Sequence, residues 1–240
     1  MSGHSKWHNI QAKKGKTDAQ RGKLFTKLGR EISVAVKEGG PDTTTNARLR
    51  LAVQKAKDNN MPNDNIAKAI KKASGEGGGI NYESITYEGY GIAGSAVIVE
   101  CLTDNKNRTA GDVRHLFDKY GGSLGQSGCV SYMFKRKGVI LIEKTAEVDS
   151  DTLFMAALDA GAEDIIEDED SFEITTTQEA FDGVVTALEG AGFALASKEI
   201  SLVPDMYVDL PEDKQATFDK MVDLLDDLDD VQSIYHNVRF

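Results

Sequence analysis

The sequence is poor in the residues that build disulfide scaffolds and in the long apolar runs that cross membranes. Its 240 residues include two cysteines, Cys101 and Cys129, both in apolar, strand-like segments without C-x-x-C spacing. We therefore expect buried, reduced thiols rather than a disulfide or a metal pair. No stretch approaches the ~18 consecutive apolar residues that a transmembrane helix requires. These absences indicate a soluble, cytoplasmic protein with no membrane partner.

Tryptophan is also scarce, and the single one, Trp7, stands in the opening segment MSGHSKWHNIQAKKGKTDAQRGKLFTK. This segment lacks the apolar run of a secretory signal. Its lysines and glycines also differ from the Arg- and Ser-rich pattern of a mitochondrial transit peptide. We expect the segment to belong to the working protein. Within these 27 residues, seven lysines and arginines stand against one acid, Asp18.

Charge is strongly separated along the chain. Residues 1–75 hold 16 Lys and Arg against 6 Asp and Glu, a balance of +10. Residues 76–144 hold 8 of each, and residues 145–240 hold 4 against 25, a balance of -21. The overall net charge of -11 hides this polarity. A basic block beside an acidic one favours a nucleic-acid partner for the basic block.

The basic block has the periodicity of helices. The spacing of its apolar residues and its glycine and proline signals predict three helices, over 17–39, 46–61 and 61–75. Each has one apolar face, so we expect a small bundle whose outer faces carry the lysines and arginines. The glycine-rich run 75–79 predicts a linker.

After the linker the pattern becomes strand-like. It predicts strands over 82–91, 95–103 and 128–134, and a helix over 107–122. From residue 138 the predicted order is β-α-β-β-α-β, the split ferredoxin-like arrangement. The tail, 211–240, predicts one more helix and one more strand, which we expect to return and complete the first α+β unit. The acidic run DLLDDLDD within it, 223–230, is interpreted as the solvated face of one helix.

These elements predict an α+β multidomain protein. It begins with an N-terminal three-helix domain, followed by two ferredoxin-like α+β domains, the second inserted in the first. The expected domains are a basic arm plus helical domain, a discontinuous α+β domain and an acidic inserted domain, with boundaries 1–75, 80–134 with 205–240, and 135–204.

Motifs of catalysis and cofactor binding are weak. Gly89, Gly91 and Gly94 match G-x-G-x-x-G, but a strand follows them instead of the helix that a dinucleotide site needs, so we predict a hairpin turn. His4 and His8 have no further metal ligands near them in the sequence. No Ser or Cys stands in a nucleophile-elbow context. We predict a protein that is not an enzyme and that has no cofactor and no metal.

The cations of the basic block are the best candidates for function. Lysines and arginines neutralise phosphates, and an exposed Trp7 ring can stack on an unpaired base, for about 1–3 kcal/mol. A second basic cluster stands at a strand-to-helix junction, where backbone N–H groups can bind an anion. The alternative is a solvated lysine-rich arm with Trp7 packed on the bundle. The predicted nucleic-acid-binding residues are Lys6, Trp7, Lys13, Lys14, Lys16, Arg21, Lys23, Lys27, Arg30, Arg48, Arg50, Lys55, Lys106, Arg108 and Arg114.

Several long motifs in one order closely resemble the YebC/PmpR family. They are GHSKW (3–7), RGKLFTKL (21–28), NARLRLAVQKAKDNNMP (46–62), YEGYG (87–91), CLTDNKNRT (101–109), VRHLF (113–117) and GGSLG (121–125). The resemblance covers essentially the whole chain and implies a helical N-terminal domain and two α/β domains of ferredoxin-like character. It implies a DNA-binding transcriptional regulator or, as in other members, a translational activator of cytochrome c oxidase subunit I or a ribosome-associated factor for proline-rich stretches.

The residues themselves leave the choice between DNA and RNA open. The helices of 1–75 lack a recognition helix with Asn, Gln and Arg grouped at its N-terminal end. A lysine-rich arm with one aromatic residue fits backbone contacts and RNA loops, including ribosomal or transfer RNA. The acidic last third would be repelled by a polyanion, so we expect it to face solvent or proteins of the ribosome or transcription machinery. We predict a non-enzymatic nucleic-acid-binding regulator of gene expression; the alternative is a ribosome-associated RNA-binding translation factor.

Overall fold

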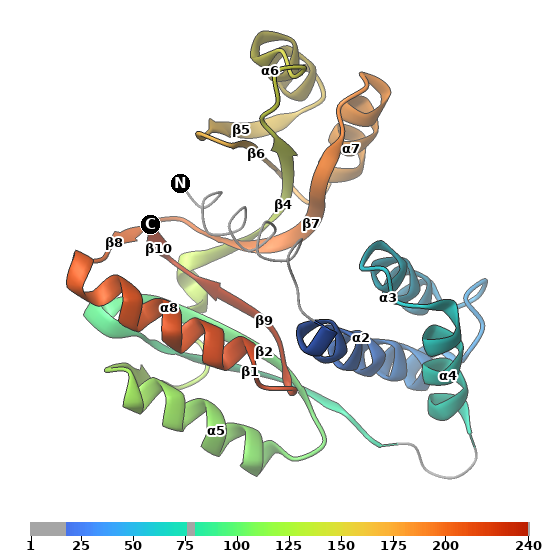
Figure 1. The fold of residues 1–240 in the computed structure, drawn as a ribbon, viewed down its shortest axis with the longest axis vertical. Coiled ribbons are helices and arrows are strands. Elements are labelled where there is room, and N and C mark those ends of the chain that lie inside the picture. Colours follow the sequence, from blue (N-terminus) through green and yellow to red (C-terminus); the bar gives the residue numbers. More distant parts are fainter. Residues whose placement is uncertain (1–17, 76–79, 240) are drawn as a thin grey trace.

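The computed structural model describes residues 18–75 and 80–239. The first described unit contains three helices, α2 (Asp18–Gly39), α3 (Ala47–Asp58) and α4 (Asn63–Ser74), shown in blue and teal in Figure 1. Asn46 caps α3 by accepting a hydrogen bond from the Leu49 backbone, and its amide donates to the Ala35 carbonyl at 2.7 Å, which ties α3 to α2. The predicted helices of this unit are confirmed. Their apolar faces close one core, made of Leu28, Ile32, Ala35, Val36, Leu49, Ala52, Ala56, Met61 and Ile66.

The second unit is an antiparallel sheet of order β3-β1-β2-β9 with helices on one face. Its strands are β1 (Glu83–Tyr90), β2 (Ala96–Thr103), β3 (Ser123–Leu124) and β9 (Val231–His236). Helices α5 (Lys106–Lys119) and α8 (Glu212–Asp226) pack on it through Phe117 and Phe218, both fully buried against Val97 and Val99 (Figure 1). A small parallel pair, β8 (Val208–Asp209) and β10 (Val238–Arg239), extends this unit.

The G-x-G-x-x-G match forms a tight β1–β2 hairpin, as predicted. Its turn is a short 3-10 segment, η1 (Ile92–Gly94), in which Gly94 has a φ of +77°. A Cβ on Gly89 would lie 2.5 Å from the Ser123 carbonyl oxygen, so glycine lets β3 approach β1. The glycines therefore serve chain geometry here.

The strand predicted over 128–134 is wrong. Most of that segment is turns and a short 3-10 helix, η2 (Ser131–Met133), and only Phe134 begins a strand. The buried Glu88 carboxylate accepts hydrogen bonds from the backbone N–H groups of Gly128, Val130 and Ser131, at 2.8, 3.0 and 2.8 Å. Burial raises the pKa of Glu88, but these hydrogen bonds together hold it below its usual value. The backbone donors that a strand ladder would use are thus bound to a carboxylate.

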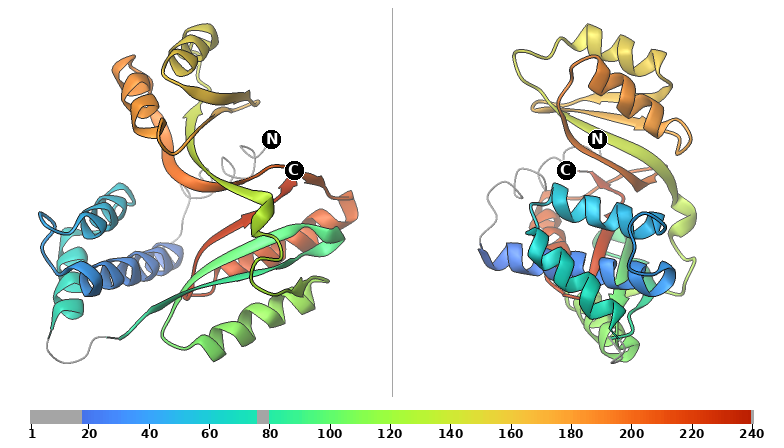
Figure 2. Two further views of the ribbon diagram at one scale, coloured as in Figure 1. Left: turned by 180° about the vertical axis from the view of Figure 1, so that it is seen from behind. Right: turned by 90° about the vertical axis from the view of Figure 1, so that its right-hand side faces the viewer.

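The third unit has the predicted β-α-β-β-α-β order. It comprises β4 (Phe134–Glu143), α6 (Ser150–Asp159), β5 (Ala162–Glu167), β6 (Ser171–Thr176), α7 (Phe181–Gly190) and β7 (Leu195–Pro204), with sheet order β5-β6-β4-β7. Ile140, Phe172 and Ile174 pack beneath the two helices. The long β4–β7 ribbon carries this unit away from the second one, as Figure 2 shows in yellow and orange.

The chain returns to the second unit after β7. Strand β9 pairs antiparallel with β2, with Val97 opposite His236, and α8 shares the core of α5. The predicted α+β class, a helical region followed by two sheet units, is confirmed. The residue boundaries 1–75, 80–134 with 205–240, and 135–204 remain our proposal for the domains. Among the described residues, no helix combines the length and the apolar character needed to span a membrane.

Candidate nucleic-acid interface

The predicted nucleic-acid-binding residues fall into two sets. Lys6, Trp7, Lys13, Lys14 and Lys16 lie outside the described residues. The others lie on α2 (Arg21, Lys23, Lys27, Arg30), α3 (Arg48, Arg50, Lys55) and α5 (Lys106, Arg108, Arg114). The structure separates these by what they contact, and the α2 residues differ most from expectation.

Lys27 and Arg30 were expected on an outer face of the bundle and Lys23 in the basic arm. All three meet the acidic segment at and after the end of α8. Lys23 Nζ lies 2.7 Å from Asp227 Oδ1, and Lys27 Nζ lies 2.8 Å from Asp226 Oδ1. Lys27 also donates to the Asp226 carbonyl oxygen at 2.6 Å, at the C-terminal end of α8, where the helix dipole favours a cation. Lys27 is consequently 8% exposed.

Asp230 is the centre of the same contact region. Its side chain is 8% exposed and accepts hydrogen bonds from Arg30, from Arg108 at 2.8 Å and from the Thr109 hydroxyl at 2.7 Å. Burial raises the pKa of Asp230, but the hydrogen bonds from Arg108, Thr109 and Arg30 together hold it below its usual value. Asp230 is therefore a carboxylate near neutral pH.

The acidic run 223–230, interpreted as one solvated helix face, has a different role. Helix α8 ends at Asp226, and three of the acids beyond its middle, Asp226, Asp227 and Asp230, bind cations of α2. At the strand-to-helix junction, where backbone N–H groups were expected to bind an anion, the Arg108 side chain pairs with the Asp230 carboxylate, and anion binding by the backbone stays a prediction. The backbone N–H of Arg108 is already bound by the Asn105 cap, at 3.1 Å.

A cleft of about 490 Å³ opens beside this network. Arg30 and Arg108 line it together with Asp104, Asp112, Asp227, Asp229 and Asp230, so its lining contains both charges and more acids than bases. The Arg30 guanidinium lies 5.2 Å from the Tyr82 ring centre, a cation–π contact. The mixed lining does not make a site for a free anion.

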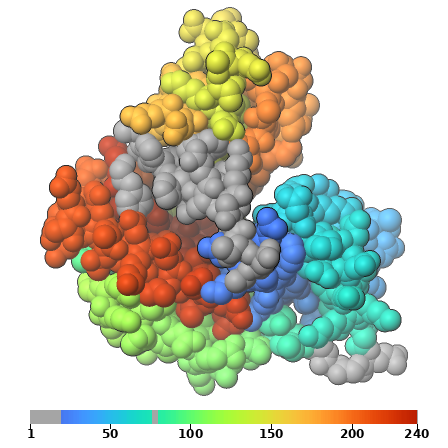
Figure 3. All heavy atoms as spheres, viewed as in Figure 1, coloured from blue at the N-terminus to red at the C-terminus, as the bar shows by residue number. Residues whose placement is uncertain are grey.

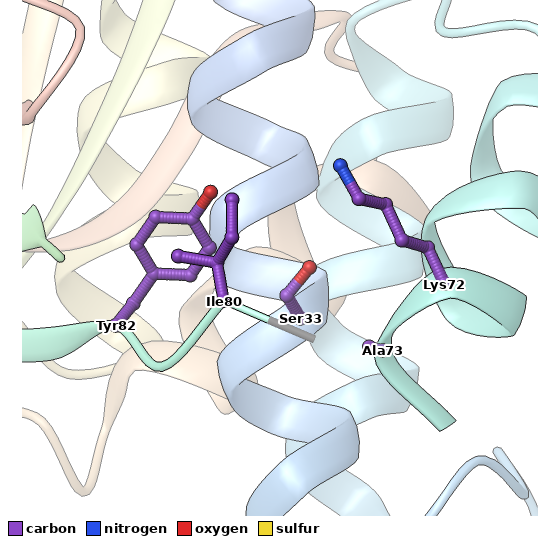
Figure 4. A pocket seen from close by; sticks show the side chains of 5 residues that line it. All are labelled: Ser33, Lys72, Ala73, Ile80 and Tyr82. Carbon is purple, nitrogen blue, oxygen red and sulfur yellow. The ribbon is translucent and has the colours of Figure 1, made fainter. Parts of the chain in front are cut away.

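A second hollow lies between α2, α4 and the segment before β1. Figure 4 shows Ser33, Ile80 and Tyr82 on one side and Lys72 and Ala73 on the other. Its volume is about 30 Å³, which is room for about one water molecule. In the part of the chain that the structure describes, no group of His, Cys, Asp and Glu side chains has the arrangement of a metal site.

Helices α3 and α4 form an outer flank of the helical unit, in cyan and teal in Figure 3. Several of the exposed cations lie on these two helices. Arg48 pairs with Glu38, and Lys55 Nζ lies 2.9 Å from Glu31, each across the surface. Exposed pairs of this kind are worth about 0–1 kcal/mol, so a phosphate can replace the carboxylate at little cost. Lys106 on α5 is similar, because it is exposed and lies 2.5 Å from Glu83.

Four further lysines on this flank are absent from the predicted set. Lys57, Lys68, Lys71 and Lys72 are exposed, and no ion pair joins any of them to another described residue. Lys68, Lys71 and Lys72 stand at i, i+3 and i+4 on α4, so their side chains are neighbours. We call Lys57, Lys68, Lys71 and Lys72 the lysine flank. The sequence pattern already placed these four lysines on the outer faces of the bundle, but they were not included among the predicted nucleic-acid-binding residues.

Cys101, Cys129 and His236 have little capacity for chemistry near neutral pH. Cys101 and Cys129 are free, as expected, although Cys129 is only half-buried. Burial raises the pKa of Cys101 to about 12, so the reactive thiolate is scarcely populated near neutral pH. Burial lowers the pKa of His236 to about 4, so this imidazole is neutral.

Family models of known proteins match all three units of the chain. A model described as the TACO1/YebC protein N-terminal domain matches residues 5–76, and one described as the TACO1/YebC second and third domain matches residues 82–238. The chain is 58% identical over 240 residues to a "Probable transcriptional regulatory protein" of Clostridium botulinum (strain Okra / Type B1), covering 100% of this chain and 98% of that relative. A protein of the same description from Clostridium beijerinckii is 60% identical with the same coverage.

A solved structure has the same architecture. The crystal structure of a conserved hypothetical protein, Aq1575 from Aquifex aeolicus, superposes with a TM-score of 0.81 at 45% sequence identity. The match covers 94% of this chain and 93% of that one.

Proposed function

The chain belongs to the TACO1/YebC family, and from that premise we propose that it is a cytoplasmic, non-enzymatic regulator of gene expression that binds nucleic acid. The name of its relatives, probable transcriptional regulatory protein, makes DNA the first target to test. The helical unit supplies the binding surface, and the acidic third unit faces proteins or solvent.

The lysine flank is the observation that carries the proposal. Lys57, Lys68, Lys71 and Lys72 are exposed cations without an acidic partner among the described residues, on a unit whose residues 1–75 have a balance of +10. Each lysine that neutralises a phosphate releases a condensed counterion, and this release is the main source of nucleic-acid affinity. A body with a net charge of -11 would otherwise repel the polyanion.

The position of these cations favours contacts to the phosphate backbone of a nucleic acid over recognition of its bases. Lys57 lies in the last turn of α3, and Lys71 and Lys72 lie in the last turn of α4. A recognition helix instead presents Asn, Gln or Arg from its N-terminal end to base edges. The helical unit therefore contacts phosphates, and its affinity for a nucleic acid depends only weakly on the nucleotide sequence.

Contacts of this type also favour the second candidate, a ribosome-associated RNA-binding translation factor that assists elongation through proline-rich stretches. Single-stranded and looped RNA offers phosphates for lysines and unstacked bases for an aromatic ring such as Trp7. No promoter sequence needs to be read for this role.

Ultraviolet crosslinking in cells, followed by sequencing of the bound nucleic acid, separates the two candidates. Reads confined to promoter DNA establish a transcriptional regulator and exclude the translation role. Reads on ribosomal or transfer RNA establish the translation factor. A crosslinked fraction equal to that of a variant without the flank cations, Lys57→Ala/Lys68→Ala/Lys71→Ala/Lys72→Ala, contradicts binding through this surface.

A further inference from the structure

The junction between the helical unit and the second unit is polar. The core of α2, α3 and α4 and the core beneath α5 and α8 are separate hydrophobic clusters. Lys23, Lys27 and Arg30, on one face of α2, make hydrogen bonds and ion pairs across to the second unit. Polar junctions of this kind permit relative movement of the units they join, in contrast to large apolar ones.

The cations at this junction have the arrangement of a phosphate-binding face. Lys23, Lys27 and Arg30 stand at i, i+4 and i+7 of α2, one above the other along about 10 Å of helix. Arg108 joins them at Asp230. Their partners in the acidic segment are the carboxylates of Asp226, Asp227 and Asp230, and Arg108 also pairs with Asp104 at 2.6 Å. A phosphodiester presents anionic oxygens of similar hydrogen-bonding geometry.

We propose that Lys23, Lys27, Arg30 and Arg108 form a second phosphate-binding surface, which the acidic segment Asp226–Asp230 occupies in the free protein and for which a nucleic-acid backbone competes. This inference rests on the proposed nucleic-acid binding. It adds a covered surface to the exposed lysine flank and links binding to movement of the helical unit.

The burial of each ion pair determines the order in which a nucleic-acid phosphate can replace the carboxylates of the acidic segment. The Lys23–Asp227 pair is outermost, with side chains 43% and 57% exposed, and the Asp226 side chain is 62% exposed. The Arg30–Asp230 pair is buried, at 13% and 8%, and Thr109 also holds Asp230 on the second unit. Exposed pairs contribute little and are screened by salt, whereas a buried pair is screened much less. Competition therefore begins at Lys23. The Lys27 side chain, which is 10% exposed, and the buried Arg30–Asp230 pair yield later.

The test compares two variants of the full chain with the same change in charge. Asp226→Asn/Asp227→Asn weakens the acidic competitor. Glu169→Gln/Asp170→Asn removes two charges from the exposed turn between β5 and β6, far from α2 in sequence and in another unit. Affinity for a fluorescein-labelled oligouridine is measured by anisotropy over a range of salt concentrations. Small-angle scattering gives the radius of gyration with and without the oligonucleotide.

We expect Asp226→Asn/Asp227→Asn to bind about two- to tenfold more tightly than the matched control, because two carboxylates no longer compete for Lys23 and Lys27. Its salt slope should steepen by about 0.7 for each lysine that gains a phosphate. In the wild type, oligouridine should increase the radius of gyration. Equal affinities of the two variants overturn the proposal while leaving the binding function intact. Binding by the Asp226→Asn/Asp227→Asn variant alone supports it. Absence of oligouridine binding by all three proteins overturns this proposal and the RNA-binding candidate, whereas DNA binding is decided by the crosslinking experiment.

Discussion

Arg30 and Asp230, separated by 200 residues in the chain, form a buried ion pair that joins helix α2 to the turn before strand β9 of the second unit. The two side chains are 13% and 8% exposed. Arg30 also donates to the Leu102 carbonyl oxygen at 3.1 Å, at the end of β2. One arginine thus contacts both the strand that leads to α5 and the turn that leads to β9.

The replacement Asp230→Asn should destabilise the protein by about 3 kcal/mol, because it leaves two arginines near a site that has lost its charge. Urea unfolding near neutral pH measures the free energy of unfolding. The matched control is Asp229→Asn, since Asp229 is the exposed neighbour, and its effect should stay within about 0.5 kcal/mol. Equal midpoints for the two variants would show that the Asp230 network contributes nothing to stability.

His236 should make stability depend on pH in the mildly acidic range. Burial lowers its pKa to about 4 from an ordinary value of 6.5. Between these values the unfolded chain binds a proton that the folded chain does not, so the free energy of unfolding falls as pH decreases. The loss between about pH 7 and about pH 5 should be about 2 kcal/mol, at about 1.4 kcal/mol for each pKa unit.

The variant His236→Gln isolates this effect. Its ring normally lies edge-on to Phe218 at 5.1 Å and its Nδ1 accepts from the Val238 backbone at 3.3 Å, so the variant starts from lower stability. What matters is the slope with pH, which should flatten between about pH 7 and about pH 5. An unchanged slope would assign the acid sensitivity to other groups.

The Glu88 carboxylate should control the order of the segment 128–131. Glu88→Gln retains one acceptor oxygen but replaces the other by an N–H donor opposite backbone N–H groups, at a cost of about 1–3 kcal/mol. Amide hydrogen exchange at Gly128, Val130 and Ser131 should accelerate more than at the core strand β2. Equal acceleration everywhere would indicate global destabilisation instead of a local role.

Local periodicity was sufficient to predict most elements of the fold. The apolar spacing of Leu28, Ile32 and Val36 identifies α2, and the β-α-β-β-α-β order identifies the third unit without any long-range information. The return of the tail followed from counting elements, since an α+β unit with an exposed apolar face needs another helix. The strand prediction for residues 128–134 was wrong because Glu88, about 40 residues earlier in the chain, accepts hydrogen bonds from the backbone N–H groups of this segment. The alternation of apolar and polar residues within the segment cannot reveal a hydrogen-bonding partner so far away in the sequence.

The candidate site was less predictable for the same reason. A helix pattern separates the apolar face of α2 from its polar face, but it cannot show that another unit covers part of the polar face. Lys23 and Lys27 therefore resembled Lys68 and Lys71 in the sequence. In the structure the first two meet Asp227 and Asp226, whereas the second two are exposed. Ion pairs between residues about 200 positions apart leave no local signal.

Removing the α4 lysines should reduce binding uniformly across nucleic-acid sequences. Lys68→Ala/Lys71→Ala/Lys72→Ala deletes three neighbouring exposed cations, and alanine preserves helix propensity. If all three contact phosphates, the slope of log affinity against log salt should become shallower by about 2 for single strands and by slightly more for duplex DNA.

The matched control, Lys198→Ala/Lys214→Ala/Lys220→Ala, removes the same charge from the acidic 145–240 segment. Since long-range repulsion is equal in both variants, only a contact surface on α4 makes the first slope shallower than the second. A loss confined to one nucleic-acid sequence would instead indicate base readout by α4.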